Sequence, residues 1–317
     1  MNDHSNIILD AKDVSKSYDG TQVLVGVDLK VRSSDFYVLM GPNGSGKSTL
    51  LSILAGTNTS DAGTVRILGH DICQDRIKAR ELIGYVPQES FCSAFLTGRE
   101  NLEYFAGLLE LDKAQAKSKI DRLLEMVGLE DDAGRRVAEY SGGMRKRLEV
   151  ATALLGNAKI LFLDESTTGL DPSVRKDFLN LLQEINKKGT AILMVTHIGE
   201  DAEVASRVGF MLHGDIIAEG TPEELKESSG LKTSIVIDAT PKSDELMMLL
   251  ASLSDDCIVT EREETFVLTC GNIKNIVPKI VEELQSSGFE MHSVNTRPPS
   301  LEDVFYHITE HPIRGEA

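Results

Sequence analysis

The sequence predicts an α/β fold with a central sheet of buried strands, followed by a smaller α+β domain near the C-terminus. Three observations lead to this prediction. Phe36 to Met40 (FYVLM), Lys159 to Ser166 (KILFLDES) and Ala191 to Val195 (AILMV) contain unbroken apolar runs, which are typical of strands buried on both faces of a parallel sheet. Helical patterns separate these runs along the chain. After a polar stretch that starts at Gly220, the pattern changes to strand–helix–strand–strand–helix–strand.

Two strands are predicted ahead of the central sheet. Ile7 to Ser17 is expected to form an edge strand, Asp19 and Gly20 a turn, and Thr21 to Val31 a second strand with alternating side chains. Tyr18 lies just before the turn. An aromatic side chain at this place either packs against the fold or stacks on an adenine ring, and the sequence leaves both readings open.

The segment GPNGSGKST, which follows the strand Phe36 to Met40, matches the pattern G-x-x-x-x-G-K-[ST] and leads into a helical run. Its backbone N–H groups can surround an anion, and the helix N-terminus adds a favourable dipole. Lys47 is expected to reach the outer phosphates of a nucleotide, and the Ser48 hydroxyl to ligate Mg²⁺. The candidate nucleotide-binding residues of this loop are Gly41, Asn43, Gly44, Ser45, Gly46, Lys47, Ser48 and Thr49.

A helical insertion is predicted after two further strands. Thr64 to Leu68 and Ile83 to Pro87 read as strands, and the second ends at Gln88. A glutamine at a strand end can bind Mg²⁺ or a water beside a phosphate. From Thr97 to about Leu129 the apolar side chains recur at helical spacing, which indicates two helices inside the α/β domain.

A second candidate anion site occurs in YSGGMRKRLEVATALL, residues 140–155. Ser141 is a favourable N-cap, and Gly142 and Gly143 begin a strong helix. A Ser-Gly-Gly turn that opens a helix can bind a phosphate with backbone N–H groups. The alternative is an ordinary capped helix without a ligand.

Three polar side chains follow two of the buried strands directly. Asp164 and Glu165 end one strand, and His197 follows the other. Because ligands bind at the carboxyl edge of open α/β sheets, these side chains are expected to meet there. Asp164 would hold Mg²⁺, directly or through water, and Glu165 would accept a proton from an attacking water. Pro172 is predicted to begin the helix that continues to about Lys187.

Composition limits the classes of function. The formal net charge is -17, which disfavours broad contact with nucleic acid or anionic lipid. The cysteines lack C-x-x-C spacing and are expected to be reduced thiols in a cytosol; they are Cys73, Cys92, Cys257 and Cys270. No signal peptide and no membrane-spanning run is expected, so another chain would have to supply any transmembrane helices.

Residues 7 to about 225 resemble the nucleotide-binding subunit of an ABC transporter. The resemblance covers the Walker A loop, the Q-loop, the signature, the Walker B strand, the D-loop and the switch histidine; in this chain these are Gly41 to Thr49, Gln88, Ser141 to Gly143, Asp164 with Glu165, Gly169 to Asp171, and His197. The resemblance implies ATP and Mg²⁺ as ligands. It also implies that Glu165, His197, Gln88 and Lys47 act in hydrolysis, and that Tyr18, Asp171 and the signature residues contact nucleotide.

The same resemblance implies partners and a location. Two copies, or two paired ATP-binding subunits, would enclose ATP at their interface, with the Ser141 turn of one facing the loop of the other. A separate membrane permease would contact the helical insertion and the segment after Gln88, which includes Phe91 and Phe95. The subunit would then lie on the cytoplasmic face of the cell membrane, held there by the permease.

Within this family the chain is most similar to subunits of the daunorubicin and multidrug-resistance exporters, because of SGGMRKRLE and the tail PPSLEDVFYHIT. This similarity implies export of a drug-like or lipid-like substrate. The alternative is a soluble ABC ATPase of translation or DNA maintenance. Two departures from the family pattern occur: Met144 follows the signature glycines, and Ser166 stands where proline is usual. Ser166 is expected to loosen the loop after Glu165.

Two domains are expected, an ATP-binding domain over residues 1–228 with a helical subdomain at about 97–155, and an accessory or regulatory domain over residues 229–317. The second is predicted to be ferredoxin-like. Its predicted elements are the strands Thr233 to Asp238, Cys257 to Arg262, Thr265 to Cys270 and Met291 to Thr296, and the helices Ser243 to Leu253, Asn272 to Ser287 and Leu301 to Thr309. Regulation, dimer stabilisation and simple packing are all compatible with this pattern.

Overall fold

The computed structural model describes residues 7–253, 258–262, 265–269 and 276–310. Contacts within the chain divide it into two units, Met1–Pro222 and Glu223–Ala317. The division falls at the start of helix α8 (Pro222–Ser228), whereas the boundary expected from the sequence lies after that helix. Among the described residues there is no helix with the length and hydropathy needed to cross a bilayer.

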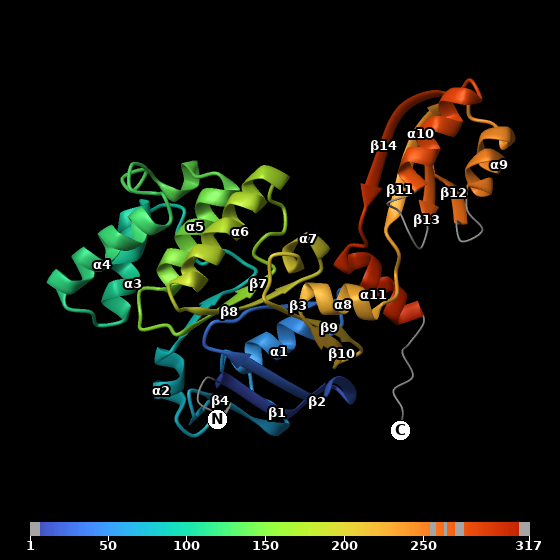
Figure 1. The fold of residues 1–317 in the computed structure, drawn as a ribbon. Helices are drawn as coiled ribbons and strands as arrows, with labels where there is room; N and C mark the ends of the chain where they lie inside the picture. The colour runs from blue at the N-terminus through green and yellow to red at the C-terminus, as the bar shows by residue number, and fades with distance from the viewer. Residues whose placement is uncertain (1–6, 254–257, 263–264, 270–275, 311–317) are drawn as a thin grey trace. The chain divides into compact units, whose positions relative to one another are not determined.

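A six-stranded sheet forms the centre of the first unit, and it confirms the α/β prediction (Figure 1). Its five strands from β9 to β6 are parallel, and β10 pairs antiparallel with β9 at one edge. The order of the strands is β10 (Asp215–Gly220), β9 (Arg207–Leu212), β3 (Phe36–Met40), β8 (Ala191–Thr196), β7 (Ile160–Asp164) and β6 (Ile83–Val86). Every residue of β3, β7 and β8 is buried, as their unbroken apolar sequences require.

A second, antiparallel sheet has the order β2 (Thr21–Arg32), β1 (Ile7–Tyr18), β4 (Ala62–Ile67) and β5 (His70–Asp71). The prediction of β1 as an edge strand is wrong, because β4 pairs with its second side. The turn between β1 and β2 has positive φ at Asp19 and Gly20 (50° and 81°). That geometry matches the twist of a two-residue hairpin.

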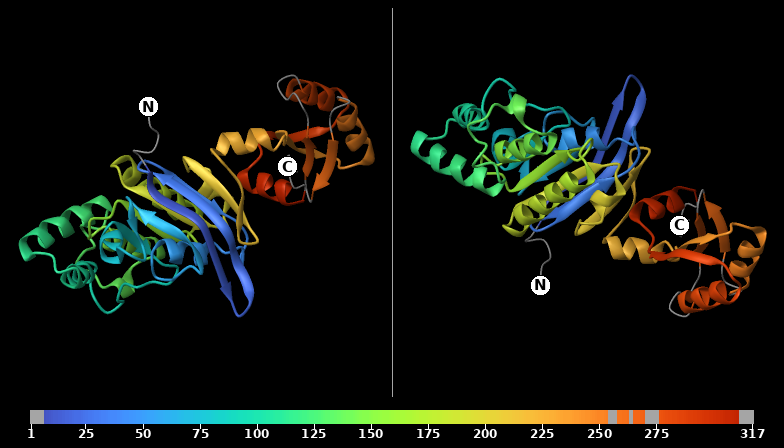
Figure 2. Two further views of the ribbon diagram at one scale, coloured as in Figure 1. Left: turned by 90° about the horizontal axis from the view of Figure 1, so that it is seen from below. Right: turned by 90° about the horizontal axis from the view of Figure 1, so that it is seen from above.

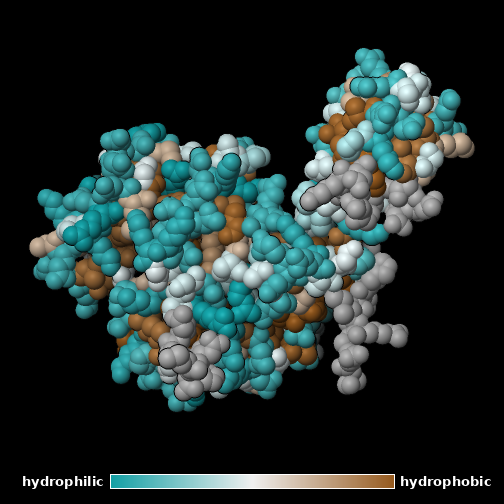
Figure 3. All heavy atoms as spheres, in the orientation of Figure 1, coloured by the Kyte–Doolittle hydropathy of each residue, from teal (hydrophilic) through white to brown (hydrophobic). Residues whose placement is uncertain are grey.

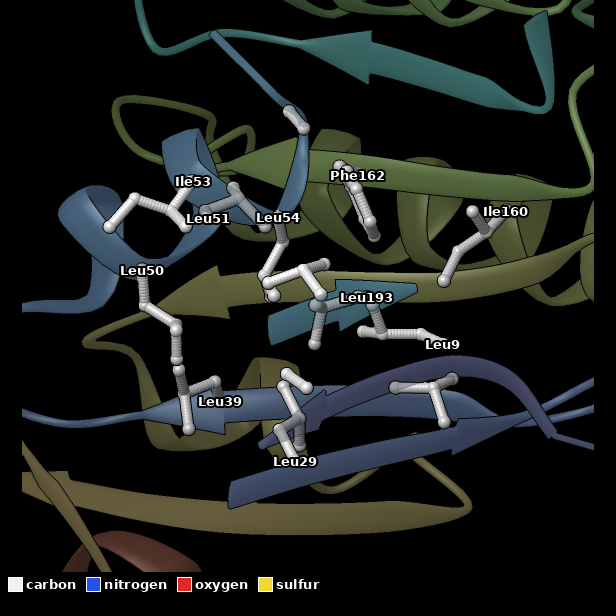
Figure 4. Close-up of a cluster of buried hydrophobic side chains, with 14 of the residues drawn as sticks. Leu9, Leu29, Leu39, Leu50, Leu51, Ile53, Leu54, Ile160, Phe162 and Leu193 are labelled. Atoms are coloured by element: carbon white, nitrogen blue, oxygen red, sulfur yellow. The ribbon is translucent and has the colours of Figure 1, made fainter. Parts of the chain in front are cut away.

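The main core lies between the antiparallel sheet, the central sheet and helix α1 (Lys47–Leu54), as Figure 4 shows. Leu50 and Leu54 of α1 meet Leu39 of β3 and Leu193 of β8, and all four are at most 1% exposed. Burial of this kind stabilises the fold by about 1.5–3 kcal/mol for each large side chain. The core therefore holds the loop before α1 firmly against the end of β3.

Helices cover the central sheet and form the predicted helical insertion (Figures 1 and 2). Thr97 and Glu100 form a capping box at the start of α3, and the Asp112 side chain caps α4. A separate apolar cluster joins α3, α4 and α5. Besides α1, the α-helices of this unit are α2 (Arg76–Glu81), α3 (Gly98–Leu108), α4 (Lys113–Met126), α5 (Gly142–Ala153), α6 (Pro172–Lys187) and α7 (Gly199–Ala202).

The second unit contains a four-stranded antiparallel sheet in the order β12 (Ile258–Arg262), β13 (Thr265–Thr269), β11 (Ser234–Thr240) and β14 (Glu290–Arg297). This order places the first strand between the third and the fourth, as the two crossovers of a βαββαβ unit require. Its described helices after α8 are α9 (Asp244–Ser252), α10 (Ile276–Ser286) and α11 (Leu301–Glu310). The predicted strand ends at Cys257 and Cys270 and the predicted start of a helix at residues 272–275 lie outside the described residues.

Hydrophilic side chains cover most of the described surface seen in Figure 3, in keeping with the net charge of -17. Apolar side chains are nevertheless exposed at a few places. Two of them, Phe95 and Leu108, are 88% and 62% exposed, and both belong to or border the helical insertion.

Candidate nucleotide site

The loop between β3 and α1 is closely surrounded by backbone. A Cβ atom at Gly41 would overlap the carbonyl oxygen of Met211, and one at Gly46 would lie 2.9 Å from the carbonyl oxygen of Val23. Gly46 also has φ 104°, a backbone angle that residues other than glycine rarely adopt. The two glycines that define the motif are therefore required by the fold, and the loop can close tightly at the N-terminus of α1.

Lys47 is 4% exposed and carries its ammonium group inside this loop. Its Nζ donates hydrogen bonds to the carbonyl oxygens of Gly41 at 2.8 Å and Pro42 at 2.9 Å. Burial lowers the pKa of Lys47, and the carboxylates of Glu165 and Asp164 partly oppose that shift. The loop therefore presents a cation that carbonyl dipoles hold in place beside two acidic groups.

Ser48 and Asp164 meet across the gap between α1 and β7. The Ser48 hydroxyl donates to Asp164 Oδ1 at 2.9 Å, and Asp164 is 5% exposed. Burial raises the pKa of the Asp164 carboxyl, while the bond from Ser48 and the charge of Lys47 lower it. A hydroxyl and a carboxylate side by side are hard oxygen ligands of the kind that Mg²⁺ prefers.

Glu165 is the point at which the other predicted catalytic residues converge. Gln88 Nε2 donates to Glu165 Oε2 at 3.3 Å, and His197 Nδ1 lies 3.4 Å from Glu165 Oε1. The Glu165 backbone has φ 45°, a strained value for a residue with a side chain. Its backbone N–H donates to Val195 O at 3.1 Å. The ends of β6, β7 and β8 thus bring Gln88, Glu165 and His197 together at one sheet edge.

Other predicted residues have contacts of their own. Tyr18 is 44% exposed, accepts a hydrogen bond from Asn58 Nδ2 at 2.6 Å, and has Lys16 Nζ 5.4 Å from its ring centre. These contacts hold the ring at the hairpin turn with one side open to solvent. Both readings of Tyr18, packing and adenine stacking, remain compatible with this arrangement.

The Ser141 hydroxyl accepts a hydrogen bond from Met144 N at 3.2 Å and so caps α5, as predicted. Gly143 has a packing role in addition, because a Cβ there would overlap the side chain of Val174 on α6. Asp171 is the residue before α6, and its carboxylate makes no capping bond to that helix. Its side chain is exposed at the helix start.

The effect of Ser166 on the mobility of the loop after Glu165 stays a prediction. Ser166 is completely buried, and backbone bonds from Thr168 N to Glu165 O and from Leu170 N to Thr167 O close the loop into turns. The loop thus contains backbone bonds of its own without a proline at residue 166.

Sequence reasoning missed a buried acid next to this edge. Asp201 is 0% exposed and accepts hydrogen bonds from the hydroxyls of Thr167 and Thr196. It lies in the segment GEDAE, between Glu200 and Glu203. No feature of one sequence distinguishes the buried carboxylate from its acidic neighbours.

Asp164→Asn is expected to raise the thermal stability of the nucleotide-free protein at neutral pH while it removes most hydrolysis. A carboxyl whose pKa is raised by folding holds its proton more tightly in the folded state. Its ionisation therefore lowers the free energy of unfolding progressively as the pH rises above the ordinary aspartate value. Asparagine avoids that cost but cannot supply the charge.

Thermal unfolding in chelator at several pH values, together with an ATPase assay, checks this prediction. The gain in midpoint should shrink as the pH falls. Asp131→Asn, at an exposed position, serves as the control for simple removal of a charge. A lower midpoint for Asp164→Asn at every pH would contradict the prediction.

Comparison with known proteins shows which family the chain resembles. Residues 24–168 match the family model of the ABC transporter, and residues 220–309 match the C-terminal domain of ATP-binding proteins of the DrrA1-3 type. The chain is 35% identical over 93% of its length to daunorubicin resistance ATP-binding protein DrrA3 of Streptomyces coeruleorubidus, of which it covers 93%. It is 29% identical over 97% of its length to linearmycin resistance ATP-binding protein LnrL of Bacillus subtilis, of which it covers 100%.

The fold is also similar to solved structures of ATP-binding subunits of ABC transporters. The cbiO1 subunit of an ABC transporter complex from Clostridium perfringens superposes with a TM-score of 0.66 and 28% identity, over 70% of this chain and 91% of that one. A dimeric ATP-binding cassette in a post-hydrolysis state, bound to ADP and phosphate, gives a TM-score of 0.60 and 27% identity, over 67% and 98% of the two chains.

Proposed function

The chain belongs to the ATP-binding subunits of ABC transporters, in the group of the daunorubicin-resistance proteins, and from this premise we propose that its ATPase drives export through a separate membrane permease. The observation that carries the proposal is the convergence of Lys47, Ser48, Asp164, Glu165 and His197 at one sheet edge. Relatives are named for resistance to daunorubicin and linearmycin and for export of Nod factor. The proposed cargo is therefore drug-like or lipid-like.

The residues of the loop between β3 and α1 fit a nucleoside triphosphate. The buried ammonium of Lys47 provides the positive charge, and Gly41 and Gly46 lie where a side chain would meet neighbouring backbone. Ser45 adds a buried hydroxyl for which the described part of the chain offers no hydrogen-bond partner. Its orphaned oxygen supports binding of a polar ligand inside the loop.

Ser48, Asp164 and Gln88 fit Mg²⁺ through their oxygen atoms, and the 2.9 Å hydrogen bond between Ser48 and Asp164 supports a ligand shared by these two. When bound, the ion neutralises negative charge on the phosphate oxygens. Glu165 would accept the proton of the attacking water, as a base beside the phosphate site. Gln88 and His197 would hold the Glu165 carboxylate and the water in line, since each lies within 3.4 Å of a Glu165 oxygen.

We further propose that two ATP-binding subunits enclose ATP at their interface. The start of α5 would supply the second half of each site, because Ser141 and Gly142 are exposed at the N-terminus of this helix, where backbone N–H groups can bind an anion. Asp171, exposed at the start of α6, would lie at the same interface. The match to a dimeric cassette supports this arrangement. No observation favours the alternative of a soluble ATPase in translation or DNA maintenance.

The permease would bind a groove between β6 and the helical insertion. The groove has a volume of about 760 Å³ and is mainly apolar. Phe91 and Phe105 form its wall, with their rings 5.4 Å apart and nearly perpendicular. Leu108 and Leu109 border it and are 62% and 49% exposed. Apolar side chains that a monomer leaves exposed around a groove are typical of a protein interface.

Leu108→Asp is expected to release the subunit from the membrane fraction of cells that contain its permease, with ATPase activity of the isolated subunit unchanged. A carboxylate in an apolar contact costs several kcal/mol when it is desolvated without a partner. Co-purification with membranes, washed in salt, gives the measurement. Met248→Asp, 72% exposed on α9, is the matched control. Equal membrane association of both variants would refute the groove as the permease site.

We assign residues 1–228 as the ATP-binding domain, with the helical subdomain over residues 97–155, and residues 229–317 as an accessory domain. Attachment through the permease would place the subunit on the cytoplasmic face of the cell membrane. The accessory domain has its own apolar core, which includes Ile235, Ile237, Phe266 and Ile280. A separate core supports independent folding of this domain.

A further inference from the structure

We propose that Asp201 is a positioning residue that couples the loop of Glu165 to the loop of His197, so that both side chains are held for hydrolysis as one unit. The inference rests on the roles proposed above for Glu165 and His197. Asp201 itself lies on α7, a short helix beside β8 and β3 (Figure 1). Among the described residues, no hydrogen bond or ion pair joins its side chain to the nucleotide loop or to the two side chains that it would position.

One carboxylate oxygen of Asp201 accepts both of the hydrogen bonds described for this side chain. Its Oδ2 atom accepts one hydrogen bond from Thr167 Oγ1 at 2.5 Å and another from Thr196 Oγ1 at 2.7 Å. All three residues are 0% exposed. Its Oδ1 atom has no hydrogen-bond partner within the described ranges. Burial raises the pKa of Asp201, and the two threonine bonds oppose that shift.

Each of the two threonines lies close in sequence to one of the two residues proposed to act in hydrolysis. Thr167 is two residues after Glu165, and Thr196 is directly before His197. Thr196 Oγ1 also accepts a hydrogen bond from Ile198 N at 3.0 Å, so this one hydroxyl fixes both sides of the histidine. One carboxylate oxygen therefore joins the segment after β7 to the segment after β8, immediately behind the point where Glu165 and His197 meet.

A third segment is connected to the same cluster. Arg175 of α6 pairs with Glu200, the neighbour of Asp201, at 3.1 Å, and its Nη2 donates to Leu170 O at 3.5 Å. The charge of Arg175 also favours the ionised form of Asp201. The start of α6, which carries the segment proposed to face the second subunit, is thus linked to the loop behind Glu165.

Burial of the Asp201 carboxylate costs free energy of folding. A buried acid with only one satisfied oxygen is expensive, and a hydrophobic residue would fill the space more cheaply. What the carboxylate adds is a side-chain connection between two loops that the backbone bond from Glu165 N to Val195 O joins only at their first residues. Misplacement of a catalytic group by about 1 Å can lower a rate on the order of 10²-fold.

The test compares Thr167→Val, Thr196→Val and the double variant with Thr152→Val. Valine keeps the shape of threonine and removes the hydroxyl. Thr152 is a matched control because it is 6% exposed and its hydroxyl bonds only within the helical region, to Leu148 O and near Cys92 Sγ. The measurements are kcat for ATP hydrolysis, the Kd for ATP from a fluorescent ATP analogue, and the thermal midpoint.

Each single variant at Thr167 or Thr196 is expected to lower kcat by about 10-fold or more, with the Kd for ATP within about twofold of the wild type. Its thermal midpoint should lie below that of Thr152→Val, because a hydrogen bond to a buried carboxylate is lost, so kcat is compared at a temperature at which every variant is folded. The double variant should lose no more kcat than the more impaired single variant, because either change breaks the same connection. Asp201→Asn should retain most activity, since its amide oxygen can still accept both hydroxyl bonds, whereas Asp201→Ala should not.

Losses in kcat that multiply in the double variant, or that equal the loss in Thr152→Val, would overturn the proposal. So would an Asp201→Ala variant with normal kcat. Glu165→Gln, measured in the same series, separates this inference from the function on which it rests. Normal hydrolysis by Glu165→Gln would refute the role of Glu165. An inactive Glu165→Gln beside threonine variants that match Thr152→Val would refute the coupling alone.

Discussion

Glu165→Gln is expected to bind ATP normally and to hydrolyse it about 10²- to 10⁴-fold more slowly, the usual contribution of a positioned base. The amide cannot accept the proton of the attacking water. Lys47, Ser48 and Asp164 make their contacts without the Glu165 carboxylate, apart from its charge, so the binding half of the site should persist. Single-turnover hydrolysis and equilibrium ATP binding measure the two effects separately.

The same variant should form a lasting dimer with ATP. Glutamine removes one negative charge beside the phosphate site, and the lack of turnover leaves ATP in place to stabilise the closed form by mass action. Gel filtration with and without ATP tests this. Glu125→Gln, exposed on α4, is the control for a change of charge alone. A variant that stays monomeric with ATP bound would refute the shared site for the isolated subunit, while normal hydrolysis would refute the role of Glu165.

Lys47→Ala is expected to weaken ATP binding strongly and to abolish measurable hydrolysis. The Lys47 ammonium is the cation that lies within the loop, and hydrogen bonds to Gly41 O and Pro42 O hold it there. Alanine removes the charge and leaves both carbonyl oxygens without this donor. Fluorescence titration with an ATP analogue measures the binding, and near-UV circular dichroism establishes that the fold persists.

Lys113→Ala, at an exposed position at the start of α4, is the matched control for loss of a lysine. It should bind and hydrolyse ATP as the wild type does. If Lys47→Ala kept wild-type turnover, the assignment of the loop between β3 and α1 as the triphosphate site would be untenable.

Much of the fold could be predicted because its determinants are local. The strand, loop and helix around Lys47 are adjacent in the chain, and so are the caps at Thr97 and Ser141 and the proline that begins α6. Each depends on residues within one turn of the feature that it fixes. The order of elements in the accessory domain was likewise visible in alternating and helical patterns.

The placement of strands beyond neighbouring pairs required the tertiary structure. β1 looked like an edge strand because its second partner, β4, comes after the nucleotide loop and α1. β9 and β10 were not predicted as strands, although β9 completes the environment of Gly41 through Met211 O. Pairing between distant segments depends on which edges remain available after the rest of the sheet has formed.

The candidate site likewise has features that the sequence predicts and features that depend on the tertiary structure. The sequence by itself determined which residues we propose for the chemistry, because Lys47, Asp164, Glu165 and His197 follow or precede recognisable strands and turns. Only the tertiary structure decided how these side chains support one another and that Asp201, unlike Glu200 and Glu203 beside it, is buried among hydroxyls. The reason is that a residue type fixes which hydrogen bonds a group can make, whereas burial and the choice of partner depend on segments that only folding brings together.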